Sequence, residues 1–169
     1  MSIVHVHLLL NHLPVVGAFL GVLLLAFALL RRSSEMGKFA LGLLPAIAAI
    51  AVVVFFTGEP AEELIEKLPG FSDVTTERHE DLARFSTIAM VGFGLLGIGA
   101  LVVFRGRALP RWVMAGGFAF ALGISGLMGA TANSGGQIRH TEIRPSGVAA
   151  GGRDRIETDE HYGPEQHPR

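Results

Sequence analysis

The sequence predicts an all-α membrane protein: a bundle of four transmembrane helices with both the N and C termini on the non-cytoplasmic side. Half of the 169 residues are hydrophobic, and only 17% are charged. The charged residues are confined to short segments, and the apolar stretches between them approach the roughly 20 residues that a helix needs to cross a bilayer. A water-soluble domain of this length would instead distribute its charges along the chain.

Four apolar stretches are expected to form the transmembrane helices. They are residues 8–30, 39–57, 82–104 and 112–132. The first is expected to be a span rather than a signal peptide, because no positively charged region precedes it and Arg31 follows in place of a small-residue cleavage site. In the second, Pro45 lacks the N–H of one helical hydrogen bond and therefore predicts a kink.

Basic residues near the helix ends predict how the bundle is oriented. The connections after the first and third helices hold one acid, Glu35, against these basic residues: Arg31, Arg32, Lys38, Arg105, Arg107 and Arg111. The connection after the second helix, residues 58–81, holds eight acidic residues against Lys67 and Arg78. Because cytoplasmic loops are enriched in Lys and Arg, the two basic connections are expected inside and the acidic one outside.

The composition changes after the fourth helix, which divides the chain into two parts. Residues 1–143 are expected to form the transmembrane domain, and residues 144–169 a polar, non-globular tail. The tail is rich in glycine, proline and charge, and it cannot bury enough apolar surface to fold alone. This orientation predicts a multi-pass protein of the bacterial inner membrane, with the tail in the periplasm.

The composition also excludes several classes of chemistry. The chain has no cysteine, which excludes disulfides, iron–sulfur clusters and thiolate chemistry. A net charge of −1 provides no basic surface for a nucleic-acid partner. No ionisable residue lies near the middle of a predicted span, which argues against a proton-coupled transporter.

The histidines all fall on the predicted outer side of the membrane. Neutral imidazole is the usual axial ligand of b-type haem, which needs no cysteine for attachment, and four-helix bundles build cofactor sites from facing helices. The candidate ligands, enough for one or two haems, are His7, His12, His79 and His140. The alternative interpretation is that these side chains lie at the level of the lipid headgroups and bind nothing.

Two arginines near these histidines are candidate partners for the haem propionates. Arg84 lies about one turn into the third predicted span, where a buried cation needs an anionic partner. Arg139 lies beside His140 and could serve in the same way.

The acidic connection offers an alternative, non-haem metal site. Mixed carboxylate and imidazole ligands on facing helices suit iron, manganese or zinc. The candidate ligands are His12, His79, Glu59, Glu62 and Glu80. The Glu-x-x-His spacing of such sites is absent, and a solvated acidic face without any metal is the competing interpretation.

Four short motifs carry a family resemblance. Residues 7–14 read His-Leu-Leu-Leu-Asn-His-Leu-Pro, residues 57–58 Thr-Gly, and residues 135–140 Gly-Gly-Gln-Ile-Arg-His, with His79 between the last two. Over residues 7–143 the chain resembles a family of four-helix bacterial membrane proteins with helix-end histidines, a domain of unknown function. The resemblance implies haem binding. The chain departs from the family in lacking the proline that often follows the first histidine, and in the acidic residues after His79.

These observations predict a membrane-anchored b-type cytochrome or a cytochrome-like electron-transfer subunit, rather than a stand-alone enzyme. It would exchange electrons between quinol or a membrane oxidoreductase and a periplasmic redox carrier. His12 and His79 are expected to be ligands, whereas His161 and His167 in the tail are not. The other hypotheses are a structural or assembly subunit of a larger membrane complex, and a membrane metalloprotein that uses the Glu/His cluster.

Overall fold

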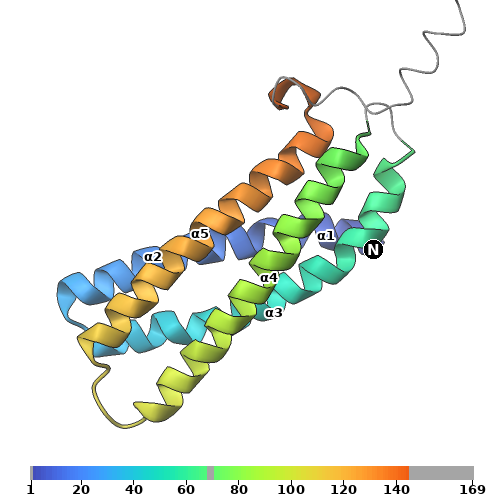
Figure 1. Cartoon of the computed structure of the whole chain (residues 1–169). Coiled ribbons are helices and arrows are strands. Elements are labelled where there is room, and N and C mark those ends of the chain that lie inside the picture. The colour runs from blue at the N-terminus through green and yellow to red at the C-terminus, as the bar shows by residue number, and fades with distance from the viewer. Residues whose placement is uncertain (1, 68–70, 145–169) are drawn as a thin grey trace, which may run out of the picture.

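A computed structural model describes residues 2–67 and 71–144 of the chain. Every regular element in these ranges is a helix, so the all-α prediction is confirmed for this part of the chain (Figure 1). The elements are α1 (Ile3–Leu10), α2 (His12–Arg31), α3 (Ser34–Ile65), α4 (Asp73–Val103), α5 (Arg111–Arg139) and the short 3-10 helix η1 (Thr141–Ile143). Most of the predicted tail, with His161 and His167, lies outside the described residues.

Four helical segments are long and apolar enough to cross a membrane: Ile3–Arg31, Ser34–Leu64, Asp73–Val103 and Arg111–Arg139. Large apolar side chains such as Leu23 point away from the bundle, as a lipid environment requires. The chain is therefore a multi-pass membrane protein.

The helices extend beyond the apolar stretches seen in the sequence. α4 begins at Asp73 rather than at residue 82, so His79 lies inside this helix and not before it. The difference arises because hydropathy detects only the apolar part of a helix, while polar turns continue the same hydrogen-bonded ladder beyond it.

Prolines affect the first two spans differently. The first span is divided at Asn11 into α1 and α2, whereas the sequence predicted one uninterrupted helix. Pro14 has no N–H to donate to the carbonyl of Leu10, four residues earlier, and α1 ends at that residue. In contrast, α3 continues through Pro45 and Pro60 and bends along its length (Figure 1).

The four long helices form a ring in which α2 packs against α3 and α5, and α4 packs against the same two helices. Leu25, Leu44 and Met90 are fully buried in the shared core. A Cβ atom at Gly97 would lie 2.8 Å from the carbonyl oxygen of Leu41, so α3 and α4 approach closely at this point. The short α1 packs mainly on α3.

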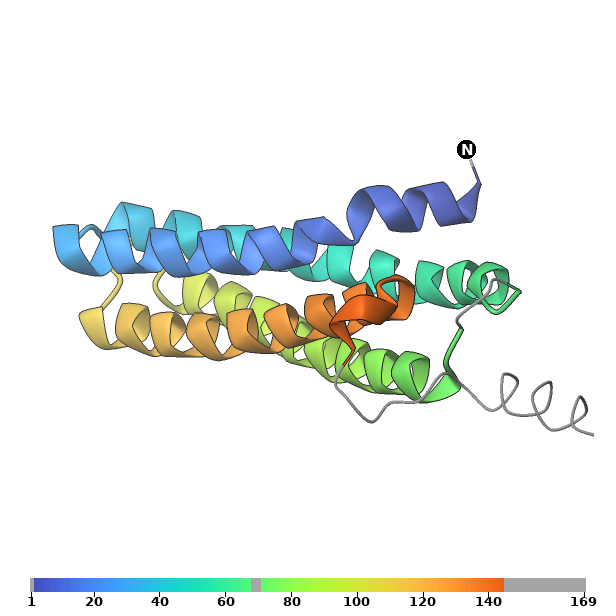
Figure 2. The same cartoon turned by 90° about the horizontal axis from the view of Figure 1, so that it is seen from above.

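The connections lie at two opposite ends of the bundle (Figure 2). At the basic end, the backbone N–H of Leu109 donates to Oγ of Ser34 over 2.7 Å, which joins the α4–α5 connection to the start of α3. The acidic end holds the α3–α4 connection, the start of α1 and the end of α5. Which end faces the cytoplasm stays a prediction from the basic residues.

Candidate functional site

His7 lies on α1 at the acidic end and is held against α3. Its Nδ1 is 3.1 Å from the carbonyl oxygen of Val54 and 3.2 Å from Oγ1 of Thr57. The Thr57 hydroxyl donates its own proton to the carbonyl of Val54, 3.0 Å away, so Oγ1 can only accept from the imidazole. Since both partners are acceptors, Nδ1 carries the proton, and a neutral His7 therefore has its free lone pair on Nε2.

His79 lies on α4 and is held against α5 in the same way. Its Nδ1 is 3.1 Å from the carbonyl oxygen of Thr131 and 3.1 Å from Oγ of Ser134. The Ser134 hydroxyl donates to the Thr131 carbonyl over 2.8 Å, so it too accepts from the imidazole. The neutral His79 ring consequently also has its free lone pair on Nε2.

The two histidine sites repeat one pattern on different helix pairs. Each has a carbonyl acceptor, a hydroxyl three residues later and a glycine directly after the hydroxyl. A Cβ atom at Gly58 would lie 3.6 Å from Cε1 of His7, and one at Gly135 would lie 2.9 Å from Cε1 of His79. The Thr-Gly and Ser-Gly pairs are thus part of the sites, and Ser134 is a partner that the sequence interpretation missed.

His7 and His79 both lie at the acidic end of the bundle. Both side chains are partly buried, and the two imidazoles are close enough to interact electrostatically. Two rings with oriented Nδ1–H groups and free Nε2 lone pairs are suited to bind a metal centre, because ligating histidines usually donate their other N–H to a carbonyl.

The other two predicted haem ligands are placed differently. His12 begins α2 and is exposed, and its Nδ1 contacts the side-chain oxygen of the preceding Asn11. His140 is exposed at the end of α5, where its Nδ1 lies 2.9 Å from Oε1 of Glu142. The backbone N–H of Glu142 and the His140 ring lower the pKa of the Glu142 carboxyl. Ligation by His12 or His140 stays a prediction.

The two arginines singled out in the sequence are also exposed. Arg84 lies on the outer surface of α4, which corrects the expectation of a buried cation in need of an anion. Its long side chain can extend along the helix toward the headgroups and keep its charge in water. Arg139, in the last turn of α5, is likewise exposed.

The carboxylates and histidines of the alternative metal site do not form one cluster. Glu62 on α3 and Glu80 on α4 are within hydrogen-bonding contact, whereas Glu59 is exposed. Across residues 2–67 and 71–144, no three His, Cys, Asp or Glu side chains are grouped so that they could hold a metal ion. The described residues therefore offer a pair of imidazoles rather than a set of ligands for a bare ion.

The fold and the site define a four-helix membrane protein with two equivalently held histidines at one end. Comparison with protein-family models, with curated proteins and with solved structures finds no match. The resemblance to the four-helix family with helix-end histidines accordingly stays a prediction.

Proposed function

We propose that the chain is a membrane-anchored b-type cytochrome, or a cytochrome-like electron-transfer subunit, in which His7 and His79 are the two axial ligands of one haem. The observation that carries the proposal is the paired setting of these rings. Each comes from a different helix pair, and each has its Nδ1–H fixed by a carbonyl and a hydroxyl.

The number of ligands favours haem over a bare metal ion. Zinc and similar ions take about four ligands, most of them from protein side chains. A haem brings its own equatorial nitrogens and needs only axial ligands from the protein. In the described ranges, no third metal-binding side chain is grouped with the two imidazoles. Two imidazoles match what a haem needs from the protein. The absence of cysteine agrees with a haem that is bound without covalent attachment.

The haem would supply reversible one-electron transfer, and the protein would supply ligand orientation. The Thr57 and Ser134 hydroxyls, together with the two carbonyls, fix the tautomer and rotation of the rings and so raise the basicity of Nε2. With the basic connections in the cytoplasm, the site lies at the periplasmic face of a bacterial inner membrane. There it is accessible to a periplasmic redox carrier or to other subunits of a membrane complex.

The visible spectrum of the purified full-length chain, expressed with an adequate supply of haem, tests the proposal. We expect a Soret band and, after reduction with dithionite, the sharp bands of a six-coordinate low-spin haem. His7→Ala and His79→Ala should each abolish this spectrum. His5→Ala is the matched control, because His5 is an exposed histidine of the same α1 helix. A wild-type chain without a Soret band, or a His79→Ala variant with an unchanged spectrum, contradicts the proposal.

A structural or assembly subunit is the second candidate, and one observation favours it. α5 presents small residues on its outer surface. A Cβ atom added at Gly116, Gly123 or Gly126 would have no side chain or second helix within 4 Å. Small residues allow another transmembrane helix to approach closely. If this surface contacts a further subunit, Gly123→Leu should dissociate a complex seen on native gels in mild detergent, and the haem spectrum should stay unchanged.

A further inference from the structure

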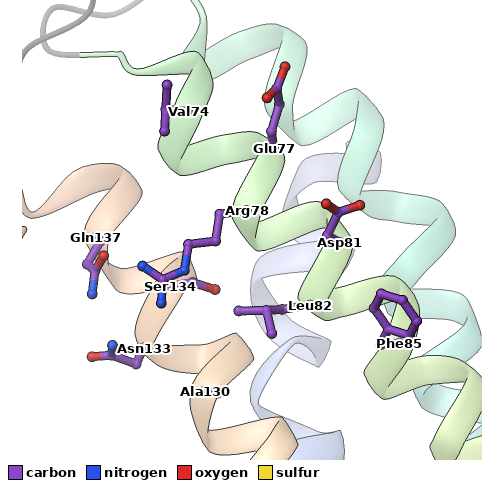
Figure 3. Close-up of a pocket in the computed structure, with 10 residues that line it drawn as sticks. All are labelled: Val74, Glu77, Arg78, Asp81, Leu82, Phe85, Ala130, Asn133, Ser134 and Gln137. Atoms are coloured by element: carbon purple, nitrogen blue, oxygen red, sulfur yellow. The ribbon is translucent and has the colours of Figure 1, made fainter. Parts of the chain in front are cut away.

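A groove of about 530 Å³ opens on the flank of the bundle between α4 and α5, near the acidic end (Figure 3). Part of its lining is apolar and comes from Val74, Leu82 and Phe85 of α4. Leu82 and Phe85 belong to the apolar span of α4, so a molecule dissolved in the bilayer can reach the groove from this end. The groove does not include His7 or His79 and is therefore distinct from the site described above.

Hydrogen-bond donors gather on the α5 side of this groove. The guanidinium of Arg78 extends from α4 toward α5, where Asn133 and Gln137 line the groove (Figure 3). Within the described part of the chain, none of these three side chains has a hydrogen-bond or ion-pair partner. Gln137 is only 8% exposed as a residue, but its amide atoms are not fully enclosed and remain accessible from the groove. A ligand in the groove can therefore form hydrogen bonds with an amide that has no partner among the described residues.

Acceptors border the same groove. Glu77 and Asp81 of α4 are also among the lining residues, although their carboxylates point away from α5 (Figure 3). Two acids beside the single cation Arg78 make the groove unfavourable for a phosphodiester headgroup. The lining suits a neutral polar head that accepts hydrogen bonds from the guanidinium and the amide N–H groups and donates hydrogen bonds to the amide oxygens.

We propose that this groove binds the headgroup of a membrane quinol or its quinone. The ring oxygens accept hydrogen bonds from Arg78 and Gln137, the quinol hydroxyls donate to the side-chain oxygen of Asn133 or Gln137, and the apolar tail follows the apolar lining into the lipid. Ser134 lines the groove and also accepts the Nδ1–H of His79, so one side chain separates the groove from that imidazole. Binding of the headgroup in this groove does not depend on the proposed function. Only the further role of the quinol as an electron source for the haem rests on it.

Photolabelling of the full-length chain in nanodiscs of neutral phosphatidylcholine tests the proposal. The probe is an azidoquinone, with decylubiquinone and a short-chain menaquinone as competitors. We expect labelled peptides from α4 and α5 around Arg78 and Gln137, and loss of the label with either competitor. Gln137→Leu and Arg78→Leu should each weaken quinone binding about tenfold, as expected for the loss of one hydrogen bond to the ligand. Arg105→Leu, at the exposed basic end, is the control and should leave binding unchanged.

Three results would overturn the proposal. They are labelling outside the groove, binding that neither variant weakens, and displacement of the probe by phosphatidylglycerol but not by decylubiquinone, which would identify a lipid-phosphate site. Arg78 is exposed, so its variant tests the groove even if Gln137→Leu fails to fold.

Haem absorbance, measured on the same samples, distinguishes failure of the groove proposal from failure of the cytochrome proposal. Quinone binding without haem contradicts only the cytochrome assignment, and haem without quinone binding contradicts only the groove.

Discussion

Alanine substitution of the two site glycines tests whether the His7 and His79 settings are as the structure shows them. Gly58 and Gly135 lie within helices and follow the hydroxyl residue of their sites. A Cβ at Gly58 would lie 3.6 Å from His7 Cε1, which is ordinary contact. A Cβ at Gly135 would lie 2.9 Å from His79 Cε1 and 3.2 Å from Nδ1, which is too close.

The geometry gives the size of the expected difference. To restore the ordinary contact distance of 3.4 Å, the His79 ring must move by about half an ångström. A shift of that size can break the two 3.1 Å hydrogen bonds of Nδ1, each of which contributes about 1 kcal/mol. Replacing a helical glycine by alanine gains up to about 1 kcal/mol in both variants, so this gain cancels in the comparison. Gly135→Ala should therefore be less stable than Gly58→Ala by about 2 kcal/mol.

Thermal unfolding and the reduced-minus-oxidised spectrum of both variants in the same detergent measure this effect. We expect Gly58→Ala to keep the spectrum of the wild type and to melt at the same temperature or a few degrees higher. Gly135→Ala should melt at a lower temperature and show a weakened or shifted haem spectrum. Equal behaviour of the two variants would refute the reasoning, because only the contact with the imidazole distinguishes them.

Three further predictions concern the ligands, the helix packing and the orientation. His12→Ala should keep the haem spectrum, because His12 is exposed and its Nδ1 contacts the neighbouring Asn11; loss of the spectrum would restore the ligand role expected from the sequence. Gly97→Ala should destabilise the bundle by about 1–3 kcal/mol in thermal or denaturant unfolding, because its Cβ would lie 2.8 Å from the Leu41 carbonyl oxygen, whereas Gly99→Ala has open space and should be tolerated. Alkaline phosphatase fused after the last residue should be active, and a fusion in the α4–α5 connection inactive; the reverse pattern would place the histidine site in the cytoplasm.

The sequence predicted the four spans because bilayer insertion depends on long apolar stretches, which a single chain displays directly. It did not predict how the first span is rotated. The sequence prediction named both His7 and His12 as candidate ligands, but the break at Asn11 separates the two histidines into different helices. Rotation about a helix axis is set by packing against neighbouring helices, and in the structure this packing leaves His12 exposed and holds His7 against α3.

The hydrogen-bond partners of the histidines were also beyond prediction from local pattern. His7 and Thr57 are 50 residues apart, and His79 and Ser134 are 55 residues apart. Each pair becomes adjacent only when two helices pack. The available signal was the repeated pair of a hydroxyl residue and a glycine at the end of the second and fourth predicted helices. Of these, the family resemblance included Thr57 but not Ser134.

The shared tautomer of the two histidines is the observation that most strongly supports the proposed haem site. The hydroxyl protons of Thr57 and Ser134 are committed to carbonyls of their own helices, so both imidazoles must donate from Nδ1. Neutral His7 and His79 then each offer only an acceptor at Nε2, and two acceptors cannot form a hydrogen bond with each other. Water, a proton or a metal centre can satisfy them, but water and a proton need no matched pair of rings, each held by a carbonyl and a hydroxyl. Two matching arrangements on separate helix pairs fit the axial ligation that we propose.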